Sequence, residues 1–243
     1  MNVKLLYRRK AEIMKIFGLQ KMTLLDFPGK VACTIFTGGC DFRCPYCHNY
    51  ELVDGSAPAL MDEEEFLQFL SKRKGLLDGV AITGGEPCIQ KDLPGLMRRI
   101  RETGFAVKLD TNGNHPEMLQ HILEEKLADY VAMDIKNAPE KYALTIGLQI
   151  FNIESVRQSA EMLLKGETDY EFRTTVVDEL HCDRDFEGIG QWIQGAKKYF
   201  LQPFTDRDTV PFGNFHAPSI DKMQRWEQIM KRYVKEVNIR GET

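Results

Sequence analysis

The sequence predicts an α/β fold in which helices cover the outside of a parallel sheet. From residue 31 onward, six short apolar or β-branched runs alternate with six segments of helical pattern. Alternation of this kind requires crossover connections, which leave the strands parallel and place the helices on the faces of the sheet. Six strands fall short of the eight that close a full (β/α)8 barrel. A chain of 243 residues that is 43% hydrophobic can bury one such core.

Each expected element follows from a local pattern. The strands are expected over residues 31–36, 79–83, 105–110, 130–135, 171–177 and 199–203. The helices are expected over residues 62–74, 93–103, 116–125, 153–165, 185–197 and 219–234, and the last of them closes the chain. The first helix opens with Asp62 and has Glu65 three residues later, which is the pattern of a capping box.

The order of elements predicts a single domain over residues 14–243. No linker, internal repeat or low-complexity segment interrupts it. Residues 1–13 carry no motif, and because Met14 is a candidate start we interpret them as a leader or as a mis-assigned start.

Three cysteines lie within eight residues, directly after the first expected strand. Cys40, Cys44 and Cys47 form a Cys-x-x-x-Cys-x-x-Cys loop, at the end of the strand where active sites of parallel sheets form. A structural zinc site takes four ligands, whereas a [4Fe–4S] cluster takes one cysteine for each iron. Three cysteines therefore indicate a cluster with one iron left free to bind another molecule. The alternative is a zinc site of the three cysteines and His48, in which two consecutive residues would have to bind one ion.

Paired glycines follow the second expected strand, in Thr83-Gly84-Gly85-Glu86-Pro87. Glycine lets the backbone approach a ligand closely, and it leaves the carbonyl groups at the strand end free to accept hydrogen bonds. A ligand ammonium group is a natural partner for these carbonyls and for the Glu86 carboxylate. Taken alone, the same residues form an ordinary turn after a strand.

Charged residues stand at the ends of the next three strands, where a buried parallel strand is normally apolar. The third strand ends in Asp110 and Thr111, the fourth in Asp134 followed by Lys136, and the fifth contains Arg173. A lysine at a strand end suits a ligand carboxylate. A buried arginine must either pair with a neighbouring acid or reach the ligand. For the third strand the alternative is a plain turn, because its Asp-Thr-Asn-Gly composition favours one.

Together these motifs resemble the radical SAM superfamily. The resemblance rests on the cysteine spacing, with Tyr46 before the last cysteine, and on the Gly-Gly-Glu motif one β/α unit later. It implies a partial (β/α)6 barrel, a [4Fe–4S] cluster on the three cysteines, and S-adenosylmethionine (SAM) on the free iron. It further implies that SAM is cleaved reductively to a 5′-deoxyadenosyl radical, and that its amino group is bound by Gly84, Gly85 and Glu86.

The strand ends also resemble those of glycyl-radical-enzyme activases such as pyruvate formate-lyase activating enzyme. The resemblance implies that Asp110, Asp134 and Lys136 surround the SAM carboxylate, together with a monovalent cation. Thr111, next to Asp110, is a further candidate for cofactor binding. Arg173 either contacts SAM or pairs with one of the acids. His48 directly follows the last cysteine, where it would tune or shield the cluster; the alternative is a solvated side chain.

Two segments favour one group of these activases. Residues 22–30, Met-Thr-Leu-Leu-Asp-Phe-Pro-Gly-Lys, form a loop that leads into the first strand, and residues 37–49 carry the cysteines. Both resemble the activating proteins of anaerobic (class III) ribonucleoside-triphosphate reductases. This resemblance implies hydrogen abstraction from a glycine of the reductase, with flavodoxin or ferredoxin as the electron donor. The alternatives are an activase of another glycyl radical enzyme, a small-molecule radical SAM enzyme, and a non-catalytic Fe–S or zinc module.

Composition indicates the surroundings of the chain. The net charge of −4 gives no electrostatic case for nucleic-acid binding. No apolar run approaches the length of a membrane span. Six cysteines, three of them clustered, indicate metal binding in a reducing cytoplasm rather than disulfides.

Overall fold

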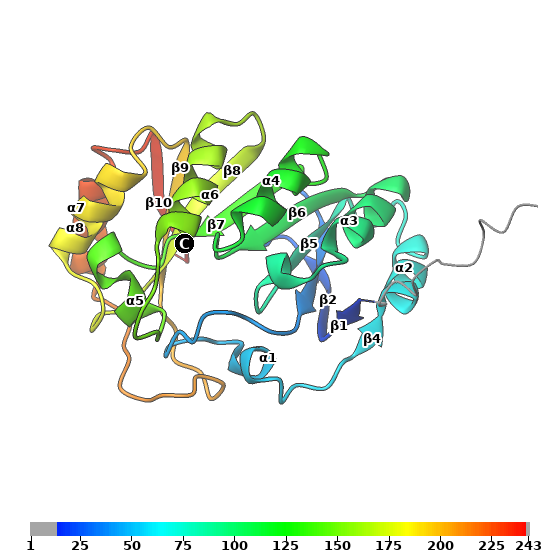
Figure 1. Ribbon diagram of the computed structural model, residues 1–243, viewed down its shortest axis with the longest axis horizontal. Helices are drawn as coiled ribbons and strands as arrows, with labels where there is room; N and C mark the ends of the chain where they lie inside the picture. Colours follow the sequence, from blue (N-terminus) through cyan, green and yellow to red (C-terminus); the bar gives the residue numbers. More distant parts are fainter. Residues whose placement is uncertain (1–13, 242–243) are drawn as a thin grey trace, which may run out of the picture.

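The strands form one curved sheet whose order follows the chain. The computed structural model describes residues 14–241, and Figure 1 shows their arrangement around an eight-stranded sheet of order β10-β9-β8-β7-β6-β5-β3-β2. The strands of this sheet are β2 (Gly18–Thr23), β3 (Ala32–Thr37), β5 (Gly79–Gly84), β6 (Ala106–Thr111), β7 (Tyr130–Asp134), β8 (Asp169–Val176), β9 (Lys198–Pro203) and β10 (Glu236–Ile239). Two short strands, β1 (Lys15–Ile16) and β4 (Met61–Asp62), pair separately and antiparallel. The predicted leader, residues 1–13, lies outside the described residues.

The six expected strands are present as β3 and β5 to β9, and neighbours among them run parallel. Parallel pairing follows from the crossover that links each strand to the next. The inner strands are largely buried, and in β7 four of the five residues are so, because both faces of the sheet are covered. The predicted α/β fold with a parallel sheet is confirmed.

Two edge strands were not predicted. β2 runs antiparallel to β3 and contains Met22 and Thr23, which the sequence assigns to a loop. β10 runs parallel to β9, where the sequence predicts that a helix closes the chain. That prediction is wrong, because the final helix stops at Met230 and the chain returns to the sheet. Neither strand shows the apolar run that predicts a buried strand, because both are short or solvated. In β2, one of the six residues is buried.

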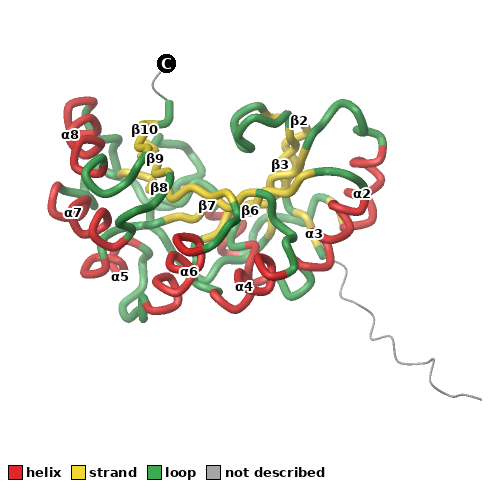
Figure 2. The backbone as a smooth tube through the Cα atoms, turned by 90° about the horizontal axis from the view of Figure 1, so that it is seen from above, coloured by secondary structure: helices red, strands yellow, loops and turns green. Residues whose placement is uncertain are grey.

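The helices α2 to α8 lie on the outer side of the sheet (Figure 2). The helices are α1 (Tyr50–Asp54), α2 (Glu63–Ser71), α3 (Leu93–Glu102), α4 (Pro116–Glu124), α5 (Tyr142–Thr145), α6 (Glu154–Lys165), α7 (Asp183–Trp192) and α8 (Ile220–Met230), with two 3-10 turns, η1 (Pro87–Ile89) and η2 (Pro139–Lys141). The predicted capping box of α2 is confirmed. Asp62 accepts a hydrogen bond from the Glu65 N–H at 3.0 Å, and Glu65 accepts one from the Asp62 N–H at 2.9 Å.

The sheet curves without closing into a barrel. Figure 2 shows it from above as an arc with β10 and β2 at its two ends. Between residues 14 and 241 no ladder joins these two strands, so one side of the barrel stays open. The carboxyl ends of the parallel strands meet at one rim, where the long segment between β9 and α8 lies beside the segment that leads to α1 (Figure 1). None of the described helices is long and apolar enough to cross a membrane.

Candidate functional site

The carboxyl ends of the parallel strands surround a cavity of about 480 Å³. The structure brings all thirteen residues predicted for the site into its lining: Cys40, Cys44, Tyr46, Cys47, His48, Gly84, Gly85, Glu86, Asp110, Thr111, Asp134, Lys136 and Arg173. Parallel strands end at a common rim, so residues far apart in the sequence meet there.

The cysteine loop crosses this rim between β3 and α1. The guanidinium group of Arg43 donates to the Cys40 carbonyl oxygen at 2.6 Å, and the Cys47 N–H donates to the Cys44 carbonyl oxygen at 3.1 Å. Burial raises the pKa of the Cys40 thiol to about 12 and that of the Cys44 thiol to about 11. Ionised sulfurs at these positions therefore need a positively charged partner, and iron ions supply one.

The alternative zinc site is not assembled. Within residues 14–241, no three His, Cys, Asp or Glu side chains converge closely enough to hold one metal ion. The His48 ring stacks on Phe204 with ring centroids 5.3 Å apart, and its Nε2 lies 2.6 Å from the Thr205 carbonyl oxygen. His48 is thus held by the segment after β9. A [4Fe–4S] cluster binds each cysteine through a different iron, so it does not require the sulfurs to meet at one point.

Gly84 and Gly85 let the end of β5 touch the cysteine loop. A β-carbon on Gly84 would lie 2.3 Å from the Thr37 nitrogen, and one on Gly85 would lie 1.8 Å from the Gly39 carbonyl oxygen. The Gly85 N–H donates to the Thr37 carbonyl at 3.0 Å, and the Glu86 N–H donates to the Gly39 carbonyl at 2.8 Å. The sequence predicts that this pair admits a ligand, whereas the groups found at close range are backbone atoms at the end of β3 and in the cysteine loop.

Glu86 joins the loop after β5 to the loop after β6. Its carboxylate accepts hydrogen bonds from the Cys88 N–H at 2.9 Å, the Thr111 hydroxyl at 2.8 Å and the Asn112 N–H at 2.6 Å. Glu86 is 1% exposed, and burial raises its pKa to about 7 against the effect of these three donors. A role of Glu86 toward the SAM amino group would have to use the remaining lone pairs of the carboxylate.

An alternating row of charges crosses the ends of β6, β7 and β8. Lys108 pairs with Asp110, whose other carboxylate oxygen lies 3.0 Å from Arg173. Arg173 also pairs with Asp134 at 2.5 Å, and the second oxygen of Asp134 lies 2.7 Å from the Lys136 ammonium group. Three cations and two carboxylates give this mostly buried row a net charge of +1. It is therefore suited to an added anion such as a carboxylate.

The row keeps both of its acids ionised. Burial acts to raise the pKa of Asp134, but Arg173 and Lys136 outweigh burial and hold that pKa well below its usual value. Burial also acts to raise the pKa of Asp110, but Arg173 and Lys108 outweigh burial, so the pKa is lowered. Each of the four carboxylate oxygens already contacts a cationic side chain, so a monovalent cation at this place would have to use the remaining lone pairs of these oxygens. Of the two roles expected for Arg173, pairing with acids is the one observed.

Tyr46 is buried beside the cysteines, and its hydroxyl has no hydrogen-bond partner in the described part of the chain. A buried hydroxyl without a partner costs about 1–3 kcal/mol, so this group is suited to a bound molecule. Three thiol ligands, a buried unpartnered hydroxyl and a cationic row for a carboxylate together fit a [4Fe–4S] cluster with SAM.

A polar cluster behind the cysteine loop was not predicted. The Asp41 carboxylate accepts hydrogen bonds from the side chains of Asn112, Asn114 and His115. Lys108 was also missed, although a charge inside a buried strand is the same signal that pointed to Arg173. For the cluster, the available signal was an acid within the cysteine loop and three polar side chains directly after β6.

Comparisons with known proteins agree with this geometry. Residues 34–179 match the model of the Radical SAM superfamily. A provisionally named glycyl-radical enzyme activating enzyme of Methanocaldococcus jannaschii is 32% identical over 235 residues, which cover 93% of this chain and 95% of the relative. The chain belongs to the glycyl-radical enzyme activating enzymes of the radical SAM superfamily. This activase is also similar to a pyruvate formate-lyase-activating enzyme of Clostridium pasteurianum, at 31% identity over 201 residues that cover 78% of this chain and 82% of the relative.

The fold of the activase is similar to that of Streptococcus suis SuiB bound to S-adenosylmethionine, with a TM-score of 0.66 and 12% identity, over 84% of this chain and 48% of SuiB. At this identity the likeness shows the fold alone. Membership in the superfamily gives the cofactors of the activase, which are a [4Fe–4S] cluster and SAM. Activating enzymes of this family act on glycyl radical enzymes.

Proposed function

We propose that this activase generates the glycyl radical of an anaerobic ribonucleoside-triphosphate reductase. The observation that supports this choice is the position of residues 22–30, whose sequence resembles the activators of these reductases. Asp26 of this segment lines the cofactor cavity and accepts a hydrogen bond from the Thr34 hydroxyl at 2.6 Å. A residue of the distinguishing segment thus faces the place that the substrate glycine has to reach.

The residues of the chain bind and orient the cofactors in this proposal. Cys40, Cys44 and Cys47 hold three irons, and the cationic row that includes Lys136 and Arg173 attracts the SAM carboxylate. When bound, the cluster and SAM supply the radical chemistry that removes a hydrogen atom from the glycine. No side chain has to transfer a proton. Flavodoxin or ferredoxin would deliver the electron.

The open side of the sheet supports a protein as the substrate. Gln20 and Asp26 line the cavity from the side of β2, and Gln202 and Thr205 line it from the side of β9. Because no ladder closes the sheet between β2 and β10 in residues 14–241, a loop of another protein can approach between these two edges. A second candidate substrate is pyruvate formate-lyase, which the similarity to the Clostridium pasteurianum enzyme favours.

The first test is anaerobic reconstitution with iron and sulfide, followed by reduction with dithionite and EPR spectroscopy with and without SAM. We expect a [4Fe–4S]⁺ signal that changes shape when SAM is added, together with release of 5′-deoxyadenosine. A cluster that does not respond to SAM would contradict the assigned cofactor site and favour a non-catalytic Fe–S module.

The second test identifies the partner. We expect a glycyl-radical EPR signal when purified anaerobic ribonucleoside-triphosphate reductase is added, and none with an equal amount of pyruvate formate-lyase. A signal with pyruvate formate-lyase alone would reassign the partner. SAM cleavage without a radical on either protein would favour a small-molecule radical SAM enzyme. Replacing dithionite by reduced flavodoxin or ferredoxin then identifies the electron donor.

A further inference from the structure

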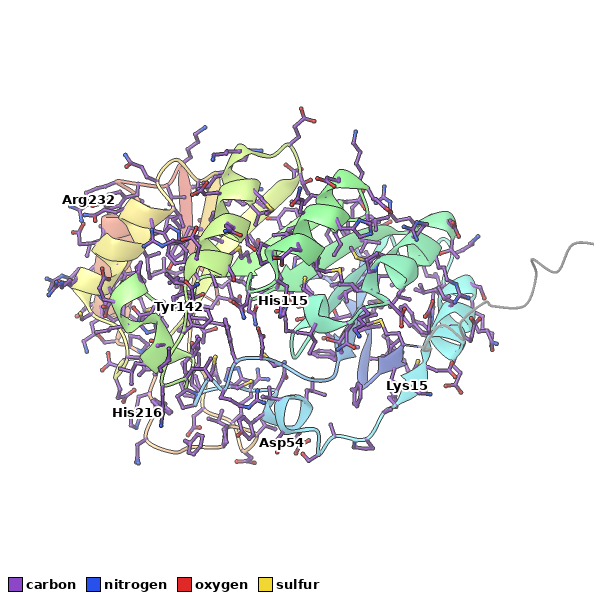
Figure 3. The ribbon with its side chains drawn as sticks, in the orientation of Figure 1. Lys15, Asp54, His115, Tyr142, His216 and Arg232 are labelled. Carbon is purple, nitrogen blue, oxygen red and sulfur yellow. The ribbon has the colours of Figure 1, made fainter. Side chains whose placement is uncertain are left out.

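Asp41 lies inside the cysteine loop but does not line the cofactor cavity. Its Oδ1 accepts a hydrogen bond from Asn112 Nδ2 at 2.8 Å. Its Oδ2 lies 2.5 Å from Asn114 Nδ2 and 3.0 Å from His115 Nε2. The three donors follow β6 on one short loop, and Figure 3 labels His115 near the centre of the molecule. One carboxylate therefore fastens the cysteine loop to the end of the neighbouring strand.

These contacts reach the first cysteine of the loop. Asp41 Oδ1 and Asn112 Nδ2 each lie 3.9 Å from Cys40 Sγ. The Asn112 N–H also donates to Glu86 at 2.6 Å, and the Glu86 N–H donates to the Gly39 carbonyl oxygen at 2.8 Å. Hydrogen bonds therefore hold the chain on both sides of Cys40. Gly39 makes them on the N-terminal side and Asp41 on the C-terminal side.

We propose that Asp41 is a positioning residue for the [4Fe–4S] cluster. Held by Asn112, Asn114 and His115, it fixes Cys40 over the end of β6 and keeps a negative charge beside the corner of the cluster that Cys40 binds. The Cys-x-x-x-Cys-x-x-Cys pattern leaves this position unspecified, so the role comes from the contacts of this chain. The proposal does not depend on which glycyl radical enzyme the protein activates.

Two consequences follow from this arrangement. Residues that orient a metal ligand typically change metal affinity by about 10–100-fold when they are removed, so loss of the Asp41 anchor releases the cluster faster. The reduction potential of an Fe–S cluster also depends on nearby charge and on hydrogen bonds to its sulfurs. Removing a negative charge beside the cluster therefore favours the reduced form.

The positional effect is tested with Asp41→Ala and a matched control, Asp54→Ala. Asp54 is an exposed acid of α1, the helix that follows the cysteine loop. After anaerobic reconstitution, an iron chelator is added and the visible absorbance of the cluster is followed. We expect D41A to lose its cluster about tenfold faster than the wild type, and D54A to stay within about twofold. Loss at the wild-type rate in D41A would overturn the positional role.

A general weakening of the fold would also speed up cluster loss, so two further readouts are needed. Thermal unfolding of the cluster-free D41A and D54A proteins measures this weakening by itself, because no cluster contributes to it. His115→Gln should keep the cluster better than His115→Ala, since glutamine retains a side-chain N–H donor for Asp41. Equal loss in both His115 variants would contradict the anchoring contact.

The charge effect is tested in a background where His115 cannot titrate. In H115Q, the further change Asp41→Asn removes one negative charge at neutral pH and keeps the size of the side chain. We expect the ratio of reduced to oxidised cluster at a fixed potential to rise about tenfold, which is about 59 mV for a one-electron couple. An EPR-monitored redox titration measures this ratio, and a change of less than about twofold would overturn the proposed electrostatic role.

Discussion

Gly85 and Gly39 meet without room for a side chain between them, because a β-carbon on Gly85 would lie 1.8 Å from the Gly39 carbonyl oxygen. The residue that follows β5 therefore packs directly against Gly39, the residue that precedes Cys40. The Gly-Gly-Glu segment therefore shapes the cysteine loop as well as bordering the cofactor cavity.

We expect Gly85→Ala to displace the cysteine loop, because a backbone oxygen cannot move aside as a side chain can. Overpacking of this kind costs about 1–3 kcal/mol, and we expect the iron content after reconstitution to fall by more than half. Gly95→Ala is the matched control, since a β-carbon on Gly95 in α3 would meet no atom within 4 Å. Iron analysis and thermal unfolding compare the two variants; equal iron in both would contradict the close contact as a determinant of cluster binding.

Cys44→Ala should abolish cluster binding and SAM cleavage and leave the fold intact. Cys44 is buried in the loop between β3 and α1 and belongs to neither element. Cys182→Ala is the control, because Cys182 is an exposed free cysteine outside the site. Iron content, circular dichroism and release of 5′-deoxyadenosine are the measurements, and SAM cleavage that survives in C44A would refute the ligand assignment.

Lys136→Ala should weaken SAM binding without loss of iron. The change removes one of the three cations of the charged row and leaves Asp134 with Arg173 alone. We expect at least about a tenfold loss of SAM affinity, or about 1.4 kcal/mol, by calorimetry on the protein with its oxidised cluster. Lys141→Ala is the control, because Lys141 pairs with Asp185 outside the cavity lining. Unchanged affinity in K136A would make Lys136 a structural partner of Asp134.

Glu86 should make the cluster-free protein less stable as the pH rises. Burial raises its pKa from 4.5 to about 7 on folding, so between these values the folded protein binds a proton that the unfolded chain has released. This difference contributes free energy of unfolding of order 3 kcal/mol. The contribution is lost as the pH rises from about 4.5 to about 7. We expect denaturant unfolding at about pH 5 and pH 8 to show a larger decrease for the wild type than for Glu86→Gln. Parallel profiles of the two proteins would rule out the titration of Glu86 as the cause.

Tyr46→Phe should have opposite effects on stability and on cofactor binding. In the described residues the Tyr46 hydroxyl is buried without a partner, so its removal should stabilise the cluster-free protein by about 1 kcal/mol or more. If the hydroxyl contacts the bound cofactors, SAM affinity should fall by several-fold in the same variant. Thermal unfolding and calorimetry measure the two effects, and a variant that is destabilised without its cofactors would show that the hydroxyl has a partner in the folded chain.

The sequence alone determined the chemistry-bearing segments and most of the scaffold. Cys40, Cys44 and Cys47 follow each other at a fixed spacing, and Gly84, Gly85 and Glu86 come directly after a buried strand. The six inner strands were predictable because burial on both faces demands apolar runs that a local pattern reveals. Charges at the ends of these runs marked Asp110, Asp134 and Lys136, since a buried strand does not otherwise end in them.

The tertiary structure decided which of these groups touch one another. Asp41 meets Asn112, Asn114 and His115 across 71 to 74 residues of sequence, and Arg173 joins Asp110 to Asp134 across three neighbouring strands. The solvated edge strands β2 and β10 also became visible only when they were paired with β3 and β9. Spacing along the chain fixes local geometry, whereas contacts between strand ends depend on the order and curvature of the whole sheet, which no local pattern encodes.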